Sequence, residues 1–342
     1  LIVVSAMGKT TNALEAVLAK KLVQADFSQD WNQIRDFHVG VCQELFPDAH
    51  PVVAKLEQLM DTAQPILEAP ISKSNYDEVY DQLICFGELL SSLVVSEYLI
   101  FRGLPLSWQD ARTVIHTDSD FRFAKIDWEK TRAACQNQWA GLLTQTTILT
   151  QGFIGQDPQG RTTTLGREGS DFTAAILATS LDAESVTIWK DVPGVLNADP
   201  KLFPNTQKFE ELRYREAAEM TYFGASVIHP KTIKPLANAG IPLFVKSFVD
   251  PEASGTKIHE HAAAHEVPTL VLKFSSICQS TLSLDSISLW SQSNPSHFTT
   301  MPTGLLVDRA MDLVEAPKPG PRDVERRLRL AQEHLADLGI TA

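Results

Sequence analysis

Cysteine is scarce in this 342-residue sequence, and the few cysteines are scattered. Cys42, Cys85, Cys135 and Cys278 form no CxxC pair, which excludes the spacing of a zinc-binding motif and the dense pairing of a disulfide framework. We therefore expect no structural metal site. Unpaired cysteines are typical of a reducing compartment, so we expect a cytoplasmic protein.

The sequence also lacks an excess of positive charge and a long apolar run. Its 30 Lys and Arg against 42 Asp and Glu give a net charge of −12, which disfavours general binding to nucleic-acid phosphates. No segment reaches the roughly 18 to 20 uninterrupted apolar residues of a membrane helix, and no signal peptide is recognised. We expect neither a nucleic-acid partner nor a membrane partner.

What the sequence does contain is enough apolar residues, 44%, for a large core. Its length predicts two domains, or one large domain with an appendage. The chain opens on the apolar residues 1–4 without an initiator Met. We expect it to begin inside a domain, with one N-terminal strand missing.

The first half of the sequence is rich in helical patterns. Residues 1–4 predict a strand, and Thr11 and Asn12 are placed to cap the helix that follows a small-residue turn. Further helices are predicted over 28–65, with breaks near Pro47 and Pro51, and over 74–102. Residues 112–116 predict a short strand.

The second half alternates strands with helices, which is typical of an α/β fold. We predict a three-layer sandwich around a mostly parallel sheet, with ligands outside the carboxyl ends of the strands. A polar stretch near 255–267 indicates a domain boundary, and a strand at 269–274 and an amphipathic helix at 322–338 are predicted beyond it. The predicted strands lie at 147–153, 185–189 and 241–245, and the predicted helices at 171–179, 213–220 and 230–239.

Several loops carry residues suited to phosphate or carboxylate chemistry. Gly8-Lys9-Thr10 resembles the end of a phosphate-binding P-loop, but Val3 stands where that motif needs its first glycine. The glycine-rich loop over 152–169 lets the backbone approach a ligand closely. Within it, Arg167 offers a planar fork for a carboxylate.

Other positions are open to two interpretations each. Ser170 and Asp171 fall at a helix start, where they are either caps or site residues. Gly87 beside Glu88 in a helix indicates the close approach of a ligand or of another backbone segment. The loop at 191–201 is either a nucleotide-binding loop or an ordinary Asp-Pro and Pro-Gly turn. His229 before Pro230 is interpreted as structural.

Taken in order, these motifs resemble the aspartate kinases, which have the amino acid kinase fold. The resemblance covers about residues 1–258. The segments that carry it are Val4-Ser5-Ala6-Met7-Gly8 with Thr11-Asn12, Gly87-Glu88-Leu89-Leu90-Ser91, Gly152-Phe153-Ile154-Gly155, Thr164-Leu165-Gly166-Arg167-Glu168-Gly169-Ser170-Asp171, Asp191-Val192-Pro193-Gly194 with Asp199-Pro200, and Phe223-Gly224-Ala225 with His229-Pro230.

The resemblance implies a kinase that phosphorylates the side-chain carboxylate of L-aspartate with ATP and Mg²⁺, at the start of lysine, threonine and methionine biosynthesis. Arg167 would hold the α-carboxylate and Glu88 the ammonium group. The remaining implied substrate residues are Ser5, Ala6, Thr11, Phe153 and Gly169. Ser170 and Asp171 would be catalytic, near the phosphoryl path. The implied nucleotide-binding residues are Lys190, Asp191, Leu196, Asp199, Lys201, Ser226 and Val227.

The resemblance further implies a catalytic domain over 1–258 and a smaller α+β, ACT-like regulatory region over 265–342, incomplete or atypical in length. A lysine or threonine effector and a homodimer are family expectations. The family's Lys-Phe-Gly-Gly-Thr-Ser segment is absent from this sequence, and Leu196, Lys201 and Ser226 stand where relatives often have an aromatic residue, Arg and Lys. Alternatives are another amino acid kinase, acting on glutamate, N-acetylglutamate or carbamate, and a non-catalytic amino-acid-binding subunit.

Overall fold

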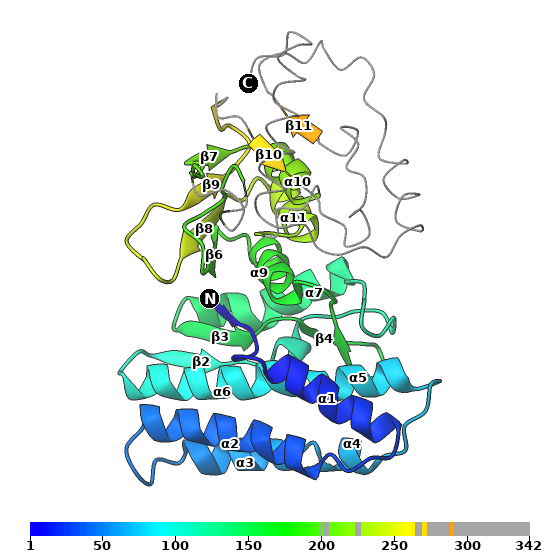
Figure 1. Ribbon diagram of the computed structural model, residues 1–342. Coiled ribbons are helices and arrows are strands. Elements are labelled where there is room, and N and C mark those ends of the chain that lie inside the picture. Colours follow the sequence, from blue (N-terminus) through cyan, green and yellow to red (C-terminus); the bar gives the residue numbers. More distant parts are fainter. Residues whose placement is uncertain (199, 201–204, 223–226, 264–268, 272–287, 291–342) are drawn as a thin grey trace. The chain divides into compact units, whose positions relative to one another are not determined.

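The computed structural model describes residues 1–198, 200, 205–222, 227–263, 269–271 and 288–290 (Figure 1). The chain divides into two compact units, Leu1–Val186 and Thr187–Ala342. Each unit is described by itself below.

The first unit is built on a three-stranded parallel sheet with the order β1-β3-β2. Its strands are β1 (Ile2–Val4), β3 (Thr147–Gln151) and β2 (Leu106–Trp108). Val4 is in register with Gln151, and Trp108 with Leu149. Because the strands are parallel, their carboxyl ends meet at one edge, where an α/β fold places its ligands. The predicted strands at 1–4 and 147–153 are confirmed, and β2 was not predicted.

Helices cover both faces of this sheet (Figure 1). One face is packed against α6 (Phe86–Phe101), and the other carries α9 (Gly169–Ser180) and α8 (Gly141–Leu143). The remaining helices of the unit are α1 (Thr10–Leu22), α2 (Ser28–Leu45), α3 (Val52–Asp61), α4 (Gln64–Glu68), α5 (Tyr76–Ile84), the 3₁₀ turn Ala111–Thr113, and α7 (Trp128–Cys135), which continues into the π-helical turn Gln136–Ala140.

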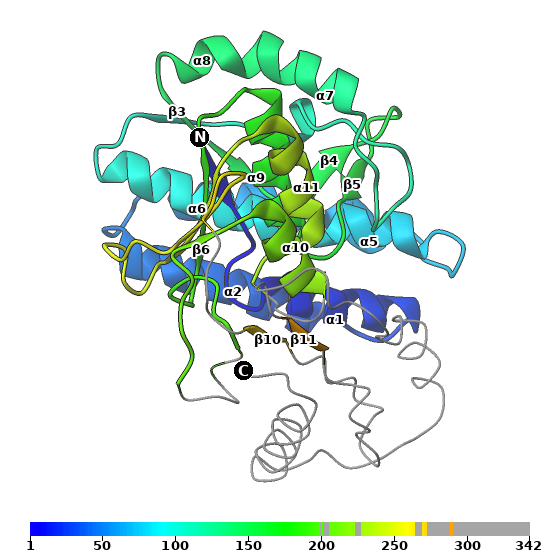
Figure 2. The same cartoon turned by 90° about the horizontal axis from the view of Figure 1, so that it is seen from above.

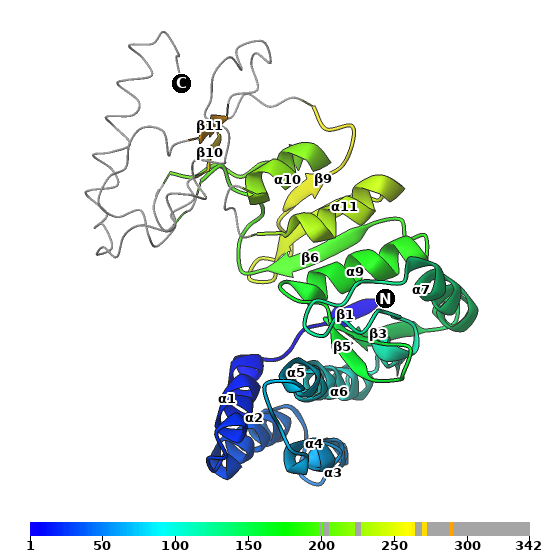
Figure 3. The same ribbon diagram turned by 90° about the vertical axis from the view of Figure 1, so that its right-hand side faces the viewer.

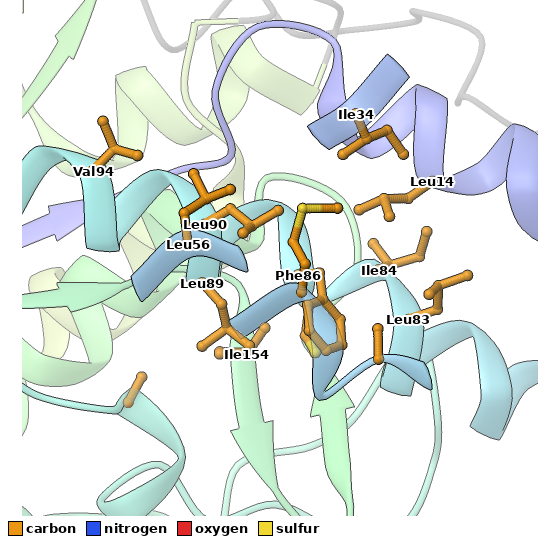
Figure 4. Packing of buried hydrophobic residues seen from close by; sticks show 14 of the residues in the cluster. Leu14, Ile34, Leu56, Leu83, Ile84, Phe86, Leu89, Leu90, Val94 and Ile154 are labelled. Atoms are coloured by element: carbon orange, nitrogen blue, oxygen red, sulfur yellow. The ribbon is translucent and has the colours of Figure 1, made fainter. Parts of the chain in front are cut away.

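The core of the unit lies between α6 and the helices outside it (Figure 4). Leu14 of α1, Ile34 of α2, Leu56 of α3 and Leu90 of α6 are all buried there. Ile154 joins them from the sheet side. This packing fixes α6, which carries Glu88, against the strands.

The predicted helix over 74–102 is confirmed, as α5 and α6 joined at Cys85. Among the described residues, Tyr76–Phe101 is long and apolar enough to cross a membrane by length and composition alone. However, 67% of its apolar window is buried inside the protein, as in a core helix. The helices predicted over 28–65 are α2, α3 and α4, with the expected break between Pro47 and Pro51.

Two local predictions were wrong. Residues 112–116 do not form a strand, because the Asp110 carboxylate accepts a hydrogen bond from the Arg112 N–H at 3.0 Å and starts the 3₁₀ turn. Thr11 and Asn12 do not cap α1, which begins at Thr10 without a side-chain cap.

The glycine-rich segment over 152–169 contains regular structure that the sequence did not indicate. Strands β4 (Ile154–Gln156) and β5 (Thr162–Thr164) pair as an antiparallel hairpin. The chain leaves β5 at Thr164 and reaches α9 within a few residues. Arg167 therefore lies on the short connection between the hairpin and α9.

The second unit has a mixed sheet with the order β6-β8-β9-β7. Strand β8 is antiparallel to β9, and β7 is parallel to β9, so the predicted mostly parallel arrangement applies to the first sheet only. Helices α10 and α11 pack side by side (Figures 2 and 3). The elements are β6 (Val186–Lys190), β7 (Glu211–Leu212), α10 (Tyr214–Tyr222), α11 (Pro230–Ala239), β8 (Leu243–Ser247) and β9 (Thr256–Ile258).

Beyond the second sheet, β10 (Thr269–Val271) and β11 (Ser288–Trp290) form an antiparallel pair. The strand predicted over 269–274 corresponds to β10. The helix predicted over 322–338 lies outside the described residues.

Candidate active site

Glu88 is a buried acid on the first turn of α6. Its residue is 4% exposed, and its Oε2 atom has no hydrogen-bond partner among the residues that the structure describes. Burial raises the pKa of Glu88 to about 8, although the backbone N–H groups of Glu88 and Ala6 favour the ionised form. A buried carboxylate with one oxygen left without a donor can bind a cation.

Gly87 explains how α6 approaches the end of β1 so closely. A Cβ atom at Gly87 would lie 3.0 Å from the Ala6 Cβ and 3.7 Å from the Thr11 Oγ1. The expected ligand or backbone segment is not what lies against Gly87: its nearest neighbours are side-chain atoms of the turn after β1 and of α1. This contact brings Ala6, Thr11 and Glu88 together.

Two further glycines let α9 approach the end of β3. The Gly152 N–H donates to the Val4 carbonyl at 2.8 Å. A Cβ at Gly152 would lie 2.5 Å from the Ser170 side chain, and one at Gly169 would lie 2.4 Å from the Phe153 ring. No larger side chain fits at either glycine without moving the helix. Phe153, Gly169 and Ser170 are therefore gathered at the same strand ends.

The Phe153 backbone is held in a left-handed conformation, with φ +69°. Its N–H donates to the Thr173 hydroxyl at 2.9 Å, and its carbonyl accepts from the Leu165 N–H at 2.9 Å. The Thr173 hydroxyl in turn donates to the Gly169 carbonyl at 3.0 Å. These bonds fix Phe153 between α9 and the end of the hairpin, which offsets the unfavourable φ.

Arg167 lies on the turn between the hairpin and α9. Its neighbours Gly166 and Glu168 both have positive φ, +73° and +53°, so the chain reverses sharply there. Arg167 is exposed, and it has no ion-pair partner among the described residues. Its guanidinium is thus available to a carboxylate ligand, which it can bind through two parallel hydrogen bonds.

Ser170 and Asp171 are in the first turn of α9, whose N-cap residue is Glu168. Neither of them is the N-cap, so the capping interpretation does not apply. The N-terminus of a helix favours anions because its first N–H groups lack partners within the helix. The α9 terminus therefore adds positive potential beside Arg167.

The predicted nucleotide residues belong to the second unit. Lys190 ends β6, and its carbonyl accepts from the Phe248 N–H at 3.0 Å. The Val195 N–H donates to the Thr256 hydroxyl at 2.9 Å. This bond holds the loop of Asp191 and Leu196 at the carboxyl end of β6.

The other nucleotide predictions lie farther along the chain. Val227 is in the turn before α11. The Nδ1 atom of His229 accepts from the Lys231 N–H at 3.2 Å and caps α11, so its structural interpretation is confirmed. Asp199, Lys201 and Ser226 lie outside the described residues.

Two site-supporting residues were missed at the sequence level. Thr173 binds both Phe153 and Gly169, and Asp81 binds the end of β5. A Thr or an Asp within a helix carries no sequence signal that distinguishes it from a surface residue. Only the fold shows that these two are buried.

Comparison with known proteins gives relatives of the same family that the motifs indicated. The model of the amino acid kinase family matches residues 1–247. The chain is 37% identical over 259 residues to lysine-sensitive aspartokinase 3 of Escherichia coli, covering 75% of the chain and 57% of that protein. It is 33% identical over 264 residues to aspartokinase 1, chloroplastic, of Arabidopsis thaliana, covering 75% of the chain and 46% of that protein.

Solved structures give the same result. The structure of E. coli aspartokinase III in complex with aspartate and ADP matches with a TM-score of 0.71 at 34% identity, covering 79% of this chain and 60% of that one. The same enzyme in complex with lysine and aspartate matches with a TM-score of 0.68. The chain spans about half the length of the two curated relatives named above. On its sequence, fold and strand-end residues, the chain belongs to the amino acid kinase family, and its similar relatives include aspartokinases.

Proposed function

We propose that this chain carries the catalytic part of an aspartate kinase, which transfers the γ-phosphoryl group of ATP to the side-chain carboxylate of L-aspartate. The observation that carries the proposal is the buried Glu88 carboxylate, whose Oε2 atom has no hydrogen-bond partner among the described residues, together with the exposed Arg167 on the turn before α9. A small zwitterion needs one anionic partner for its ammonium group and one cationic partner for its carboxylate. The aspartate complex of the E. coli relative supports the assignment.

In the proposed complex, Arg167 binds the α-carboxylate and Glu88 binds the ammonium group. Ionised Glu88 is unfavourable without a ligand because of its burial. The ligand's ammonium group would stabilise that charge. The pocket wall is assigned to Ser5, Ala6, Thr11, Phe153 and Gly169.

The reaction transfers one phosphoryl group. A side-chain carboxylate oxygen of aspartate attacks the γ-phosphorus, the bond from that phosphorus to the bridging oxygen breaks, and ADP leaves with the electron pair. The product is an acyl phosphate, 4-phospho-L-aspartate. Such transfer depends on positioning and on charge neutralisation, and Ser170 and Asp171 at the start of α9 are assigned to this part of the site.

The proposed cofactors are ATP and Mg²⁺. Among the described residues, no group of three or more His, Cys, Asp or Glu could hold a metal ion. Mg²⁺ does not require such a group, because it is often bound by one or two carboxylates together with nucleotide phosphates. Asp171 would contribute such a carboxylate, and Mg²⁺ would neutralise charge on the phosphates. Nucleotide binding is assigned to Lys190, Asp191, Leu196 and Val227, and, outside the described residues, to Asp199, Lys201 and Ser226.

Regulation and assembly are also part of the proposal. The complex of the E. coli relative with lysine and aspartate supports a lysine effector, and a threonine effector is the alternative. We assign an ACT-like regulatory region to 265–342 and propose a homodimer. A cytoplasmic location is consistent with the free, buried thiols of Cys42, Cys85 and Cys135.

The test is an assay of purified protein with ATP, Mg²⁺ and L-aspartate, in which hydroxylamine traps the acyl phosphate. We expect a hydroxamate that requires aspartate. Glutamate, N-acetylglutamate and carbamate are tested in parallel, and Glu88 predicts rejection of acetylated acceptors because they lack the ammonium group. No aspartate-dependent hydroxamate, or preference for an acetylated acceptor, would contradict the proposal.

A further inference from the structure

Asp81 is a buried acid outside the proposed substrate set. It lies on α5 and is 0% exposed. Its carboxylate accepts hydrogen bonds from the Thr164 N–H at 2.8 Å, the Thr164 hydroxyl at 2.7 Å and the Arg122 N–H at 2.9 Å. One carboxylate therefore joins α5 to two separate segments of the chain.

These two segments meet around the turn that carries Arg167. Thr164 is the last residue of β5, and its carbonyl accepts from the Ala124 N–H at 3.1 Å. A Cβ at Gly166 would lie 2.9 Å from the Phe123 ring and 3.1 Å from the Arg122 carbonyl. The segment 122–124 thus runs along the end of β5 and closes over Gly166.

The Arg122 segment is itself unusual. Arg122 has φ +70°, and its guanidinium lies 4.4 Å from the centre of the Tyr80 ring and 3.2 Å from the Asp77 carboxylate. A non-glycine residue in this conformation needs support from its surroundings. The Asp81 carboxylate supplies it through the Arg122 N–H.

Asp81 accepts hydrogen bonds from three donors, and its ionised form can accept from all of them. Burial raises the pKa of Asp81 to about 6, although hydrogen bonds from Thr164 and Arg122 favour the ionised form. An ionised carboxylate only accepts hydrogen bonds and can serve all three donors. An asparagine has one acceptor oxygen, so its NH₂ group faces either the Thr164 hydroxyl, which must then reverse and accept, or a backbone N–H. The first arrangement loses the negative charge of the acceptor, and the second leaves a buried N–H unsatisfied, at about 1 to 3 kcal/mol.

We propose that Asp81 is a positioning residue for substrate binding: it holds the end of β5 and the 122–124 segment so that the Gly166–Arg167 turn meets the substrate carboxylate. This inference rests on the proposed function, because it assigns Arg167 to that carboxylate. Among the described residues of its unit, the hydrogen bonds of Asp81 go to Thr164 and Arg122 and to none of the proposed substrate residues. Its effect passes through the backbone of β5 and of the 122–124 segment.

The chain offers a matched control at the other end of the same hairpin. Asp157 is 3% exposed and accepts from the Arg161 N–H at 2.9 Å, the Gln159 N–H at 3.0 Å and the Ser119 hydroxyl at 2.9 Å. It is also a buried carboxylate with several donors, but two of them, the Gln159 and Arg161 N–H groups, lie in the hairpin turn, and Ser119 precedes the 122–124 segment. Replacing it should destabilise the hairpin without moving the Arg167 turn.

The experiment compares Asp81→Asn with Asp157→Asn by steady-state kinetics and thermal unfolding. We expect Asp81→Asn to raise the KM for aspartate about 10-fold or more, with the KM for ATP changed by less than about 2-fold. Asp157→Asn should lower the Tm but leave both KM values within about 2-fold. A general loss of stability would not produce this split.

A milder variant covers the case in which Asp81→Asn does not fold. Thr164→Val removes only the hydroxyl donor to Asp81, and we expect it to raise the aspartate KM by about 2- to 5-fold. An active wild type with an unchanged aspartate KM in the folded Asp81 or Thr164 variant would overturn the inference. An equal rise in Asp157→Asn would overturn it as well. A wild type without aspartate-dependent turnover would instead contradict the proposed function.

Discussion

The two charged groups of the proposed aspartate site are held in opposite ways. Glu88 is on a long core helix, 4% exposed, with an oxygen that has no partner among the described residues. Arg167 is exposed on a short turn between two residues with positive φ. One charge is placed by core packing, and the other is placed by backbone conformation.

The difference follows from the chemistry of the two side chains. A carboxyl group can become neutral, so it tolerates burial by keeping its proton until a cation arrives. A guanidinium does not lose its proton in proteins, so leaving it in water avoids a large desolvation cost. The acid should therefore respond to pH and to ligand, whereas the arginine should respond to changes in its turn.

The largest expected effect comes from removing the arginine. Arg167→Ala should lower kcat/KM for aspartate by about 100-fold or more, because the loss of a charged, hydrogen-bonded partner costs about 2 to 5 kcal/mol. Nucleotide affinity, measured by calorimetry, should stay within about 2-fold. Since Arg167 is exposed, the Tm should change little.

Arg167→Lys is the control for charge alone. Lysine keeps the positive charge but lacks the planar fork, so we expect an intermediate loss of kcat/KM. Unchanged aspartate kinetics in Arg167→Ala would remove this residue from the site.

Replacing the acid should lower kcat/KM less than removing the arginine does. Unlike the arginine change, it should alter how stability depends on pH. Glu88→Gln should lower kcat/KM for aspartate by about 10- to 100-fold, because the amide cannot pair with an ammonium group. Folded Glu88 keeps its proton to about pH 8, whereas the usual pKa is 4.5. Between these values the unfolded chain binds fewer protons, so wild-type stability should fall as pH rises.

Glu88→Gln does not titrate and should lack this decline. The measurement is the Tm of both proteins at about pH 5 and at about pH 8, where the variant should show the smaller difference. An identical pH dependence in both proteins would show that Glu88 does not hold its proton in the folded state.

The turn can be tested without touching a charge. Gly166→Ala introduces a Cβ that would lie 2.9 Å from the Phe123 ring, at φ +73°, and we expect a loss of about 1 to 3 kcal/mol in the free energy of unfolding. The aspartate KM should rise with it, because the turn carries Arg167. Denaturant unfolding and kinetics measure the two effects.

Gly103→Ala is the matched control for Gly166→Ala. Gly103 has φ +86°, and a Cβ there would meet nothing within 4 Å. It should lose only the conformational part, about 1 kcal/mol, with unchanged kinetics. Equal effects of the two variants on the aspartate KM would argue against the placement of Arg167 by its turn.

How much could be predicted differs along the chain for physical reasons. Gly87 beside Glu88 was informative because a glycine within a helix is costly and needs a local cause. Asp81 gave no such signal, because its burial depends on Thr164, which is 83 residues away. The 3₁₀ turn at 111–113 was missed because one Asp110 side chain overrides the strand preference of its neighbours.

The central claim is that Glu88 and Arg167 bind an amino acid together, and proton release upon binding tests it most directly. Calorimetry of L-aspartate binding at pH 7, in buffers with different ionisation enthalpies, counts the protons. Since burial raises the pKa of Glu88 to about 8 and an ammonium ligand would lower it, we predict release of about 0.5 to 1 proton from the wild type and none from Glu88→Gln. Aspartate binding without proton release, or equal release from both proteins, would contradict the account.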